Sequence, residues 1–329
     1  MSRVLACVSI LAVFLCLTSS AFAQTVLLVD GSINAPSGTN VYSTLQGAID
    51  AAADGDIIHV APAPGGYDGI TIEGKSVKIY GPGYFVGTIP WGTIRVNPLG
   101  GPAVAIIGPA ASGTEIYGLR LAGNVEPKNA DPSTPLENVV IARCVIGSSF
   151  ERDDVDDGVI SNFVLRNNIV LGFVDTGRVN SSGLPISNLV LSNNVLSNNV
   201  FLTDGGTHQV YNNIFRGGTD VRFNNSQVNN NIFYDAALNN CLPNGSCQDN
   251  DFNSNIFHET GADDHDFGAD PSNTGSGNID ADPQFVDFPI SELINERDDV
   301  GALDFHLDTG SPGIGAGTDG SNIGLFGGT

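Results

Sequence analysis

Acidic side chains gather in the glycine- and asparagine-rich segments of this 329-residue sequence. The two densest groups comprise Asp153, Asp154, Asp156 and Asp157, and then Asp263, Asp264 and Asp266. Clustered carboxylates suit a hard cation such as calcium, which prefers oxygen ligands. Neither group has the spacing of an EF-hand loop. They are candidate calcium ligands, and the alternative is that they are solvated aspartates in turns.

Carboxylates and guanidinium groups also recur in neighbouring segments of the same kind. They are Asp175, Arg178, Asp204 and Arg222. Two carboxyl groups that face one groove can hydrolyse a glycosidic bond by acid–base catalysis, and Asp154–Asp157 and Asp175–Asp204 are candidate pairs. No Gly-x-Ser-x-Gly elbow and no His-Glu-x-x-His motif is present, which argues against a serine hydrolase of that type and against a zinc protease.

Aromatic residues form two groups with different expected roles. Tyr67, Tyr84 and Trp91 lie close together in the sequence, and their rings could stack on sugar faces or serve in turns and caps. Phe215, Phe233 and Phe257 recur at one phase of a repeat. Stacked rings are ordinary core in repeat proteins, so this second group predicts an internal stack.

The charge balance limits the partners that the chain can bind. Asp and Glu total 36 against 13 Lys and Arg, which gives a formal net charge of −23. Such a surface repels nucleic acids and anionic membranes but attracts divalent cations. We therefore expect no nucleic-acid partner and no membrane insertion.

The N-terminus has the pattern of a secretory signal. An apolar run, Val4 to Leu17, is followed by Ala21-Phe22-Ala23, which predicts a signal peptide over 1–23 with cleavage before Gln24. A secreted chain meets an oxidising medium, and Cys241 and Cys247 flank a short turn-forming segment. We expect a disulfide between them, a buried Cys144, and a secreted protein that we predict to be a monomer.

A repeated phrase indicates the fold. Residues 160–169 (ISNFVLRNNI) and 186–195 (ISNLVLSNNV) are near copies 26 residues apart. Degraded copies continue the pattern, and the asparagine before each branched residue falls at 168, 194, 213, 231, 255 and 278. An earlier copy has Cys144 at this position.

Units this short cannot bury a hydrophobic face alone, so they must stack on their neighbours. Alternating branched and polar residues predict one parallel strand set per unit, that is, an all-β, right-handed parallel β-helix as a single domain over 24–329. The recurring asparagines should stack into a ladder along one corner, because buried amides need partners. The extra residues of each unit fall at equal phase and should form a wall or groove along one side. These predicted loops are 147–158, 172–183, 197–206, 216–226, 234–251 and 258–277.

A short helix should cover the open N-terminal end of the solenoid. Ser43 to Gln46 has the form of a capping box, and Leu45, Ala48, Ile49 and Ala52 then follow helical spacing. We predict a cap over about 43–55 and a closing segment over about 281–329.

Both ends of the mature chain resemble a known family. Residues 44–60 (TLQGAIDAAADGDIIHV) are similar to the opening of right-handed β-helix proteins of the pectate-lyase-like superfamily, and 305–317 (FHLDTGSPGIGAG) are similar to the close of bacterial ones. That resemblance implies a calcium-assisted β-elimination of uronates, with Arg178 or Arg222 as the base. The motif sets of polygalacturonases and pectinesterases are missing here, which opposes both of those activities.

Three functions remain open from the sequence. The first is binding of extracellular polysaccharide, calcium or both along the loop-lined groove. The second is a polysaccharide lyase or glycoside hydrolase that acts on an acidic glycan. The third is a purely structural surface solenoid. A β-helix supports all three, so the fold alone does not choose among them.

Overall fold

The structure is a computed structural model of the whole chain. It describes residues 24–32, 38–83, 95–97, 101–152, 158–177, 184–202, 206–237, 248–258, 272–287 and 304–324. The predicted signal peptide lies outside this set. Within it, no helix is both long and apolar enough to cross a membrane.

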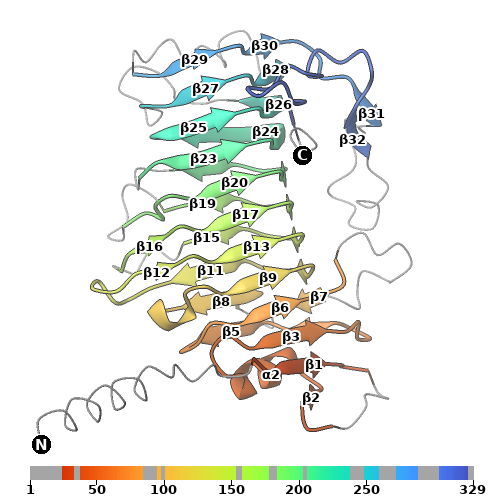
Figure 1. The fold of residues 1–329 in the computed structure, drawn as a ribbon, viewed down its shortest axis with the longest axis vertical. Coiled ribbons are helices and arrows are strands. Elements are labelled where there is room, and N and C mark those ends of the chain that lie inside the picture. The colour runs from red at the N-terminus through yellow and green to blue at the C-terminus, as the bar shows by residue number, and fades with distance from the viewer. Residues whose placement is uncertain are drawn as a thin grey trace, which may run out of the picture.

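Strands from successive turns of the chain stack side by side along a rod (Figure 1). Sheet A has twelve strands. In spatial order they are β2 (Val41–Tyr42), β1 (Val26–Val29), β3 (Ile57–Val60), β6 (Lys78–Tyr80), β9 (Glu115–Tyr117), β13 (Val140–Ala142), β17 (Val164–Arg166), β20 (Val190–Ser192), β23 (His208–Tyr211), β25 (Ser226–Asn229), β27 (Asp251–Asn253) and β29 (Thr274–Ser276).

A second set of strands, which we call sheet B, follows sheet A in each turn. It contains β4 (Tyr67–Asp68), β7 (Arg95–Asn97), β10 (Arg120–Leu121), β14 (Val145–Ile146), β18 (Ile169–Val170), β21 (Val195–Leu196), β24 (Ile214–Phe223), β26 (Ile232–Ala237), β28 (Ile256–His258) and β30 (Ile279–Asp280).

The third set, sheet C, contains β5 (Ile70–Glu73), β8 (Val104–Ile107), β11 (Val125–Lys128), β15 (Phe150–Glu151), β19 (Val174–Asp175), β22 (Val200–Leu202) and the second half of β24. The long strand β24 thus joins sheets B and C into one sheet of sixteen strands. All pairings within these sheets are parallel, which confirms the predicted parallel β-helix. Two small pairs complete the strands: β12 (Leu136–Glu137) with β16 (Ile160–Ser161), and β31 (Phe285–Asp287) with β32 (Asp304–Leu307).

Paired asparagines turn the chain from sheet A into sheet B. The first of each pair, as in Asn167 and Asn193, has a positive φ of 54°, a conformation that asparagine tolerates better than most residues. The second is buried, and its side-chain oxygen accepts the backbone N–H of the equivalent residue one coil earlier. Five such bonds, from Asn168 to Asn278, span 2.8–3.0 Å. The predicted ladder is confirmed, and Cys144 adjoins it by donating its backbone N–H to Asn168 Oδ1 at 3.0 Å.

Branched and aromatic residues fill the interior of the solenoid. The rings of Phe215, Phe233 and Phe257 stack with centroids 4.6 Å and 4.9 Å apart and planes 6° and 7° from parallel. All three are buried. The predicted internal phenylalanine stack is therefore confirmed.

The N-terminal cap is α2 (Leu45–Ala51), at the base of the rod in Figure 1. Leu45, Ala48 and Ile49 face the core as predicted. The N-cap is Thr44, whose Oγ1 accepts the Gly47 N–H at 3.1 Å, so the sequence interpretation placed the cap one residue too early. Gln46 instead bonds to the backbone of Thr71, because the first coil offers it an unpaired strand edge.

The closing segment folds back along the outside of sheet B (Figure 1). Phe305 and Ile323 are buried in a second hydrophobic cluster with Ile232 and Ile256. Asn230 anchors the segment, because its Oδ1 accepts the Thr318 N–H at 2.9 Å. An apolar outer face of sheet B thus explains why the sequence continues past the last coil. A short 3-10 turn, η2 (Pro109–Ala111), connects early coils.

Candidate functional site

Most of the segments predicted as loops contain sheet C strands. Residues 147–158, 172–183 and 197–206 include β15, β19 and β22, and 216–226 overlaps β24. The interpretation as loops was wrong at these points. Strands of two or three residues show too little alternation to be recognised between glycine and aspartate residues. Two predicted catalytic residues, Asp175 and Arg222, consequently lie in strands.

Those two residues belong to one outward row of sheet C. Across adjacent strands, Glu151 pairs in register with Asp175, Asp175 with Phe201, and Phe201 with Arg222. Their neighbours Phe150, Val174, Val200 and Val221 are fully buried. Since side chains alternate between faces, the row itself points outward. Neighbouring members are about 4.8 Å apart along the rod.

The carboxylates in this row are held by local donors. Asp175 Oδ1 accepts the backbone N–H of Gly177 at 2.9 Å. Glu151 Oε1 accepts the side-chain amide of Asn124 on an earlier coil. Both acids are half-buried. Their orientation is thus set before any ligand arrives.

Arg222 is engaged on two sides. Its Nη2 and Nε lie 2.5 Å and 3.2 Å from the two carboxylate oxygens of Asp220, and its guanidinium carbon is 4.9 Å from the centroid of the Phe201 ring. A fork-like ion pair stabilises the charged guanidinium. The structure separates Arg222 from Asp175 by the Phe201 strand.

Two phenylalanines on this face were missed by the sequence interpretation. Phe173 immediately precedes buried Val174, so it shares the outer face with Asp175, and it is 41% exposed. Phe201 lies between buried Val200 and Leu202 and is half-buried. The signal was the period-two alternation around each valine, which the short length of these strands obscured.

Other predicted site residues lie outside the described residues: Trp91, Tyr84, Arg178, Asp204, the calcium candidates Asp153, Asp154, Asp156, Asp157, Asp263, Asp264 and Asp266, and Cys241 with Cys247. Where the structure is described, no group of three or more His, Cys, Asp or Glu side chains is arranged to hold a metal. Among the described residues beside these positions, Arg152 and Gly177 follow β15 and β19, and Leu202 is the last residue of β22.

Tyr67 is placed inside the first coils. It is 5% exposed, its hydroxyl donates to the Ala61 carbonyl at 2.5 Å, and it accepts the Gly31 N–H at 3.2 Å. Burial raises the pKa of the Tyr67 hydroxyl. Its ring therefore stabilises the N-terminal coils and is not part of an exposed sugar platform.

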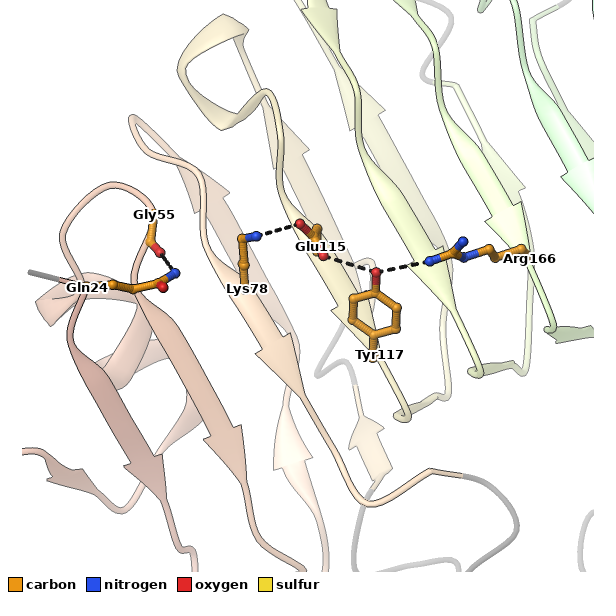
Figure 2. A network of polar contacts seen from close by, with 6 residues as sticks. All are labelled: Gln24, Gly55, Lys78, Glu115, Tyr117 and Arg166. Carbon is orange, nitrogen blue, oxygen red and sulfur yellow. Dashed lines mark hydrogen bonds and ion pairs between the residues drawn. The ribbon is translucent and has the colours of Figure 1, made fainter. Parts of the chain in front are cut away.

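A polar network crosses the outer face of sheet A (Figure 2). Lys78 Nζ lies 2.8 Å from Glu115 Oε1, and Tyr117 donates its hydroxyl to Glu115 Oε2 at 3.0 Å. Arg166 Nη2 in turn donates to the Tyr117 hydroxyl at 3.4 Å. Sequence reasoning could not find this network, because its ends lie on coils far apart in the chain.

The network shifts the titration of its members. Partial burial disfavours ionised Glu115, but hydrogen bonds from Lys78 and Tyr117 and the positive charges outweigh it, so the pKa of Glu115 is lowered. The Glu115 hydrogen bond and charge raise the pKa of Lys78. Burial is the main cause of the raised pKa of Tyr117. All three groups keep their ordinary charge states at neutral pH.

No protein-family model matches this chain, and no curated protein sequence is significantly similar to it.

Proposed function

We propose that this protein binds an extracellular polysaccharide along the outer face of sheet C, without cleaving it. The parallel β-helix, with the resembling segments at both ends, supports membership of the pectate-lyase-like superfamily. The signal-like N-terminus supports secretion. A chain with a net charge of −23 would meet its ligand in a medium where calcium is available, and calcium remains part of the proposal.

One observation carries this function: exposed Phe173, two residues before Asp175, and half-buried Phe201, the register partner of Asp175 on the next strand, share the outer face of sheet C with this carboxylate. Sugars combine apolar C–H faces with hydroxyl donors. Phenylalanine rings pack against the C–H faces, and carboxylates accept hydrogen bonds from the hydroxyl groups. Arg222 and Asp220 extend the polar part of the face by one coil.

The repeat of the solenoid suits an extended chain. The row from Glu151 to Arg222 crosses four strands in register, so a polysaccharide that lies along the rod meets a new side chain at each strand. The sequence insertions start beside this row, at Arg152, Gly177 and Leu202.

A glycoside hydrolase is the second candidate, because Glu151 and Asp175 are adjacent in register on one face. Two carboxyl groups that face the same groove are the basic requirement of that reaction. The lyase alternative loses support because Arg222 is held as an ion pair.

Calorimetric titration of the mature protein with neutral and acidic oligosaccharides, with calcium or with chelator, tests the proposal. Phe173→Ala and Phe201→Ala should each weaken binding roughly tenfold. Val286→Ala removes an exposed side chain from β31 and should leave affinity unchanged. Absence of binding to every glycan in both conditions would overturn the proposal. Release of reducing ends that is lost in Glu151→Gln would favour the hydrolase instead.

A further inference from the structure

The outer face of sheet A carries a column of rings that ends abruptly. His59 and Tyr80 have centroids 5.7 Å apart, and Tyr80 and Tyr117 stack at 5.1 Å with planes 4° from parallel. The next position in register is Ala142, followed by Arg166. One face of the Tyr117 ring therefore has a ring partner, while the side toward the C-terminal coils has only a methyl group at the next strand.

Arg166 reaches back across this gap. The strands β9 and β17 are two spacings apart, about 10 Å, yet Arg166 Nη2 donates to the Tyr117 hydroxyl (Figure 2). Ala142 beneath is 1% exposed. The guanidinium has five N–H donors, and one of them is used in this bond. The other N–H groups of Arg166 belong to an exposed side chain, and the hydrogen bond to Tyr117 fixes its direction.

The rest of the network fixes that direction. Tyr117 donates to Glu115, and Glu115 pairs with Lys78. The Tyr117 hydroxyl thus has its proton committed to Glu115 and presents a lone pair to Arg166. Arg166 is an exposed side chain at the edge of the network, and a guanidinium fork matches the geometry of a carboxylate.

The local charge is opposite in sign to that of the chain. The outward positions of β6, β9, β13 and β17 carry Lys78, Glu115 and Arg166 as charged residues, and exposed Arg143 follows β13. Three cations thus stand against Glu115 and, just before β13, Glu137, which accepts the Asn162 side-chain amide at 3.5 Å, in a chain of net charge −23. On a chain that is otherwise negatively charged, a positive patch attracts an anionic group to this part of the surface.

An apolar row runs beside the patch. Val140, Val164 and Val190 pair in register on the outer face and are half-buried. Valines that point outward on three successive coils offer C–H contacts at each strand spacing. All strands here are paired on both sides, so the face offers no edge to an added peptide strand.

We propose that this face is a second glycan site that binds an acidic sugar unit, with its carboxylate on Arg166 and its C–H face on the valine row. The inference rests on the proposed function for the class of ligand, a polysaccharide, but uses residues on a different sheet. Because the carboxylate would bind the Arg166 donors that the Tyr117 hydrogen bond leaves, binding does not require Lys78 and Glu115 to separate.

The test compares an oligogalacturonide with its carboxyl-reduced, neutral counterpart in calorimetric titrations. Arg166→Gln should weaken binding of the acidic oligomer at least tenfold and leave the neutral one unchanged, and Arg166→Lys should recover only part of the loss. Lys75→Gln removes one cation from beside the N-terminal cap, where its Nζ donates to helix carbonyls, and is the matched control, with less than a twofold effect.

Three results would overturn this inference: equal affinity of wild type and Arg166→Gln, equal binding of the acidic and reduced oligomers, or a ligand-free dimer in sedimentation that Arg166→Gln dissolves. In the last case the patch binds a second copy of the acidic chain. Failure of this inference is distinguishable from failure of the proposed function. If wild type binds neutral glycans and Phe173→Ala weakens that binding, the proposed function stands even when Arg166→Gln has no effect.

Discussion

Asn213 Oδ1 accepts two hydrogen bonds from Asn194, one from the backbone N–H and one from the side-chain Nδ2, both at 3.0 Å. The Asn213 amide itself donates to the Leu191 carbonyl at 2.7 Å. These bonds link Asn213 to the coil before it, and its amide also donates to the Tyr211 carbonyl on its own coil at 3.1 Å. The second asparagine of each pair thus has partners for its amide although it is buried, which is why one residue type recurs at that position.

Asn213→Ala should lower the free energy of unfolding by about 2–4 kcal/mol, because it leaves buried donors and acceptors on two coils without partners. Urea denaturation followed by circular dichroism measures the change. Gln209→Ala, an exposed position on the same coil, should change the free energy by less than about 0.5 kcal/mol. Equal effects at the two positions would show that the ladder does not stabilise the solenoid.

Cys144→Asn should extend the ladder by one coil. Cys144 Sγ lies 3.3 Å and 3.9 Å from the Ala142 and Ile116 carbonyls, and Asn168 donates to the equivalent carbonyl of Ile141 at 2.9 Å. We expect a gain of up to about 1 kcal/mol in unfolding free energy. Cys144→Leu should instead destabilise the protein, since a branched apolar group cannot pair there. An asparagine variant less stable than the leucine variant would contradict the interpretation.

The buried thiol of Cys144 should be chemically inert in the folded protein. Burial raises its pKa to about 12, and the thiolate is the reactive form. An alkylating reagent at pH 8 should modify Cys144 only after denaturant is added, as mass spectrometry of the peptide would show. Modification at the same rate without denaturant would contradict the described burial.

Glu115→Gln should destabilise the protein at neutral pH but not in acid. The folded-state pKa of Glu115 is lowered, so its contribution is present above the unfolded value of about 4.3 and is lost as pH falls through the folded pKa. The difference between wild type and variant should be below about 1 kcal/mol at pH 7 and should shrink below about pH 4. A difference that grows in acid would reverse the assigned sign.

Phe233→Ala removes the middle ring of the internal stack and should cost about 3–5 kcal/mol. Phe173→Ala is the matched control, because the same side chain is exposed there, and it should cost less than about 1 kcal/mol. Thermal unfolding of the two variants compares them. Similar losses would contradict the different placement of the two rings.

The sequence predicted correctly those residues whose type recurs at the same position of successive coils. The ladder asparagines and the stacked phenylalanines recur because each coil meets the same neighbour, so spacing alone located them. The strands β15, β19 and β22 were missed because two or three residues give too short an alternation to separate from a turn. The contact between Arg166 and Tyr117 spans 49 residues and two coils, and no local pattern records it.

Hydroxyl-radical footprinting of the mature protein, with and without a bound oligosaccharide, tests the central claim most directly. If the glycan lies on the outer face of sheet C, oxidation of Phe173 and Phe201 should fall several-fold on binding, while oxidation of Val286 and Ile314, both exposed in the closing segment, should not change. Unchanged oxidation of both phenylalanines under conditions where calorimetry shows a saturated complex would contradict the account and place the ligand elsewhere.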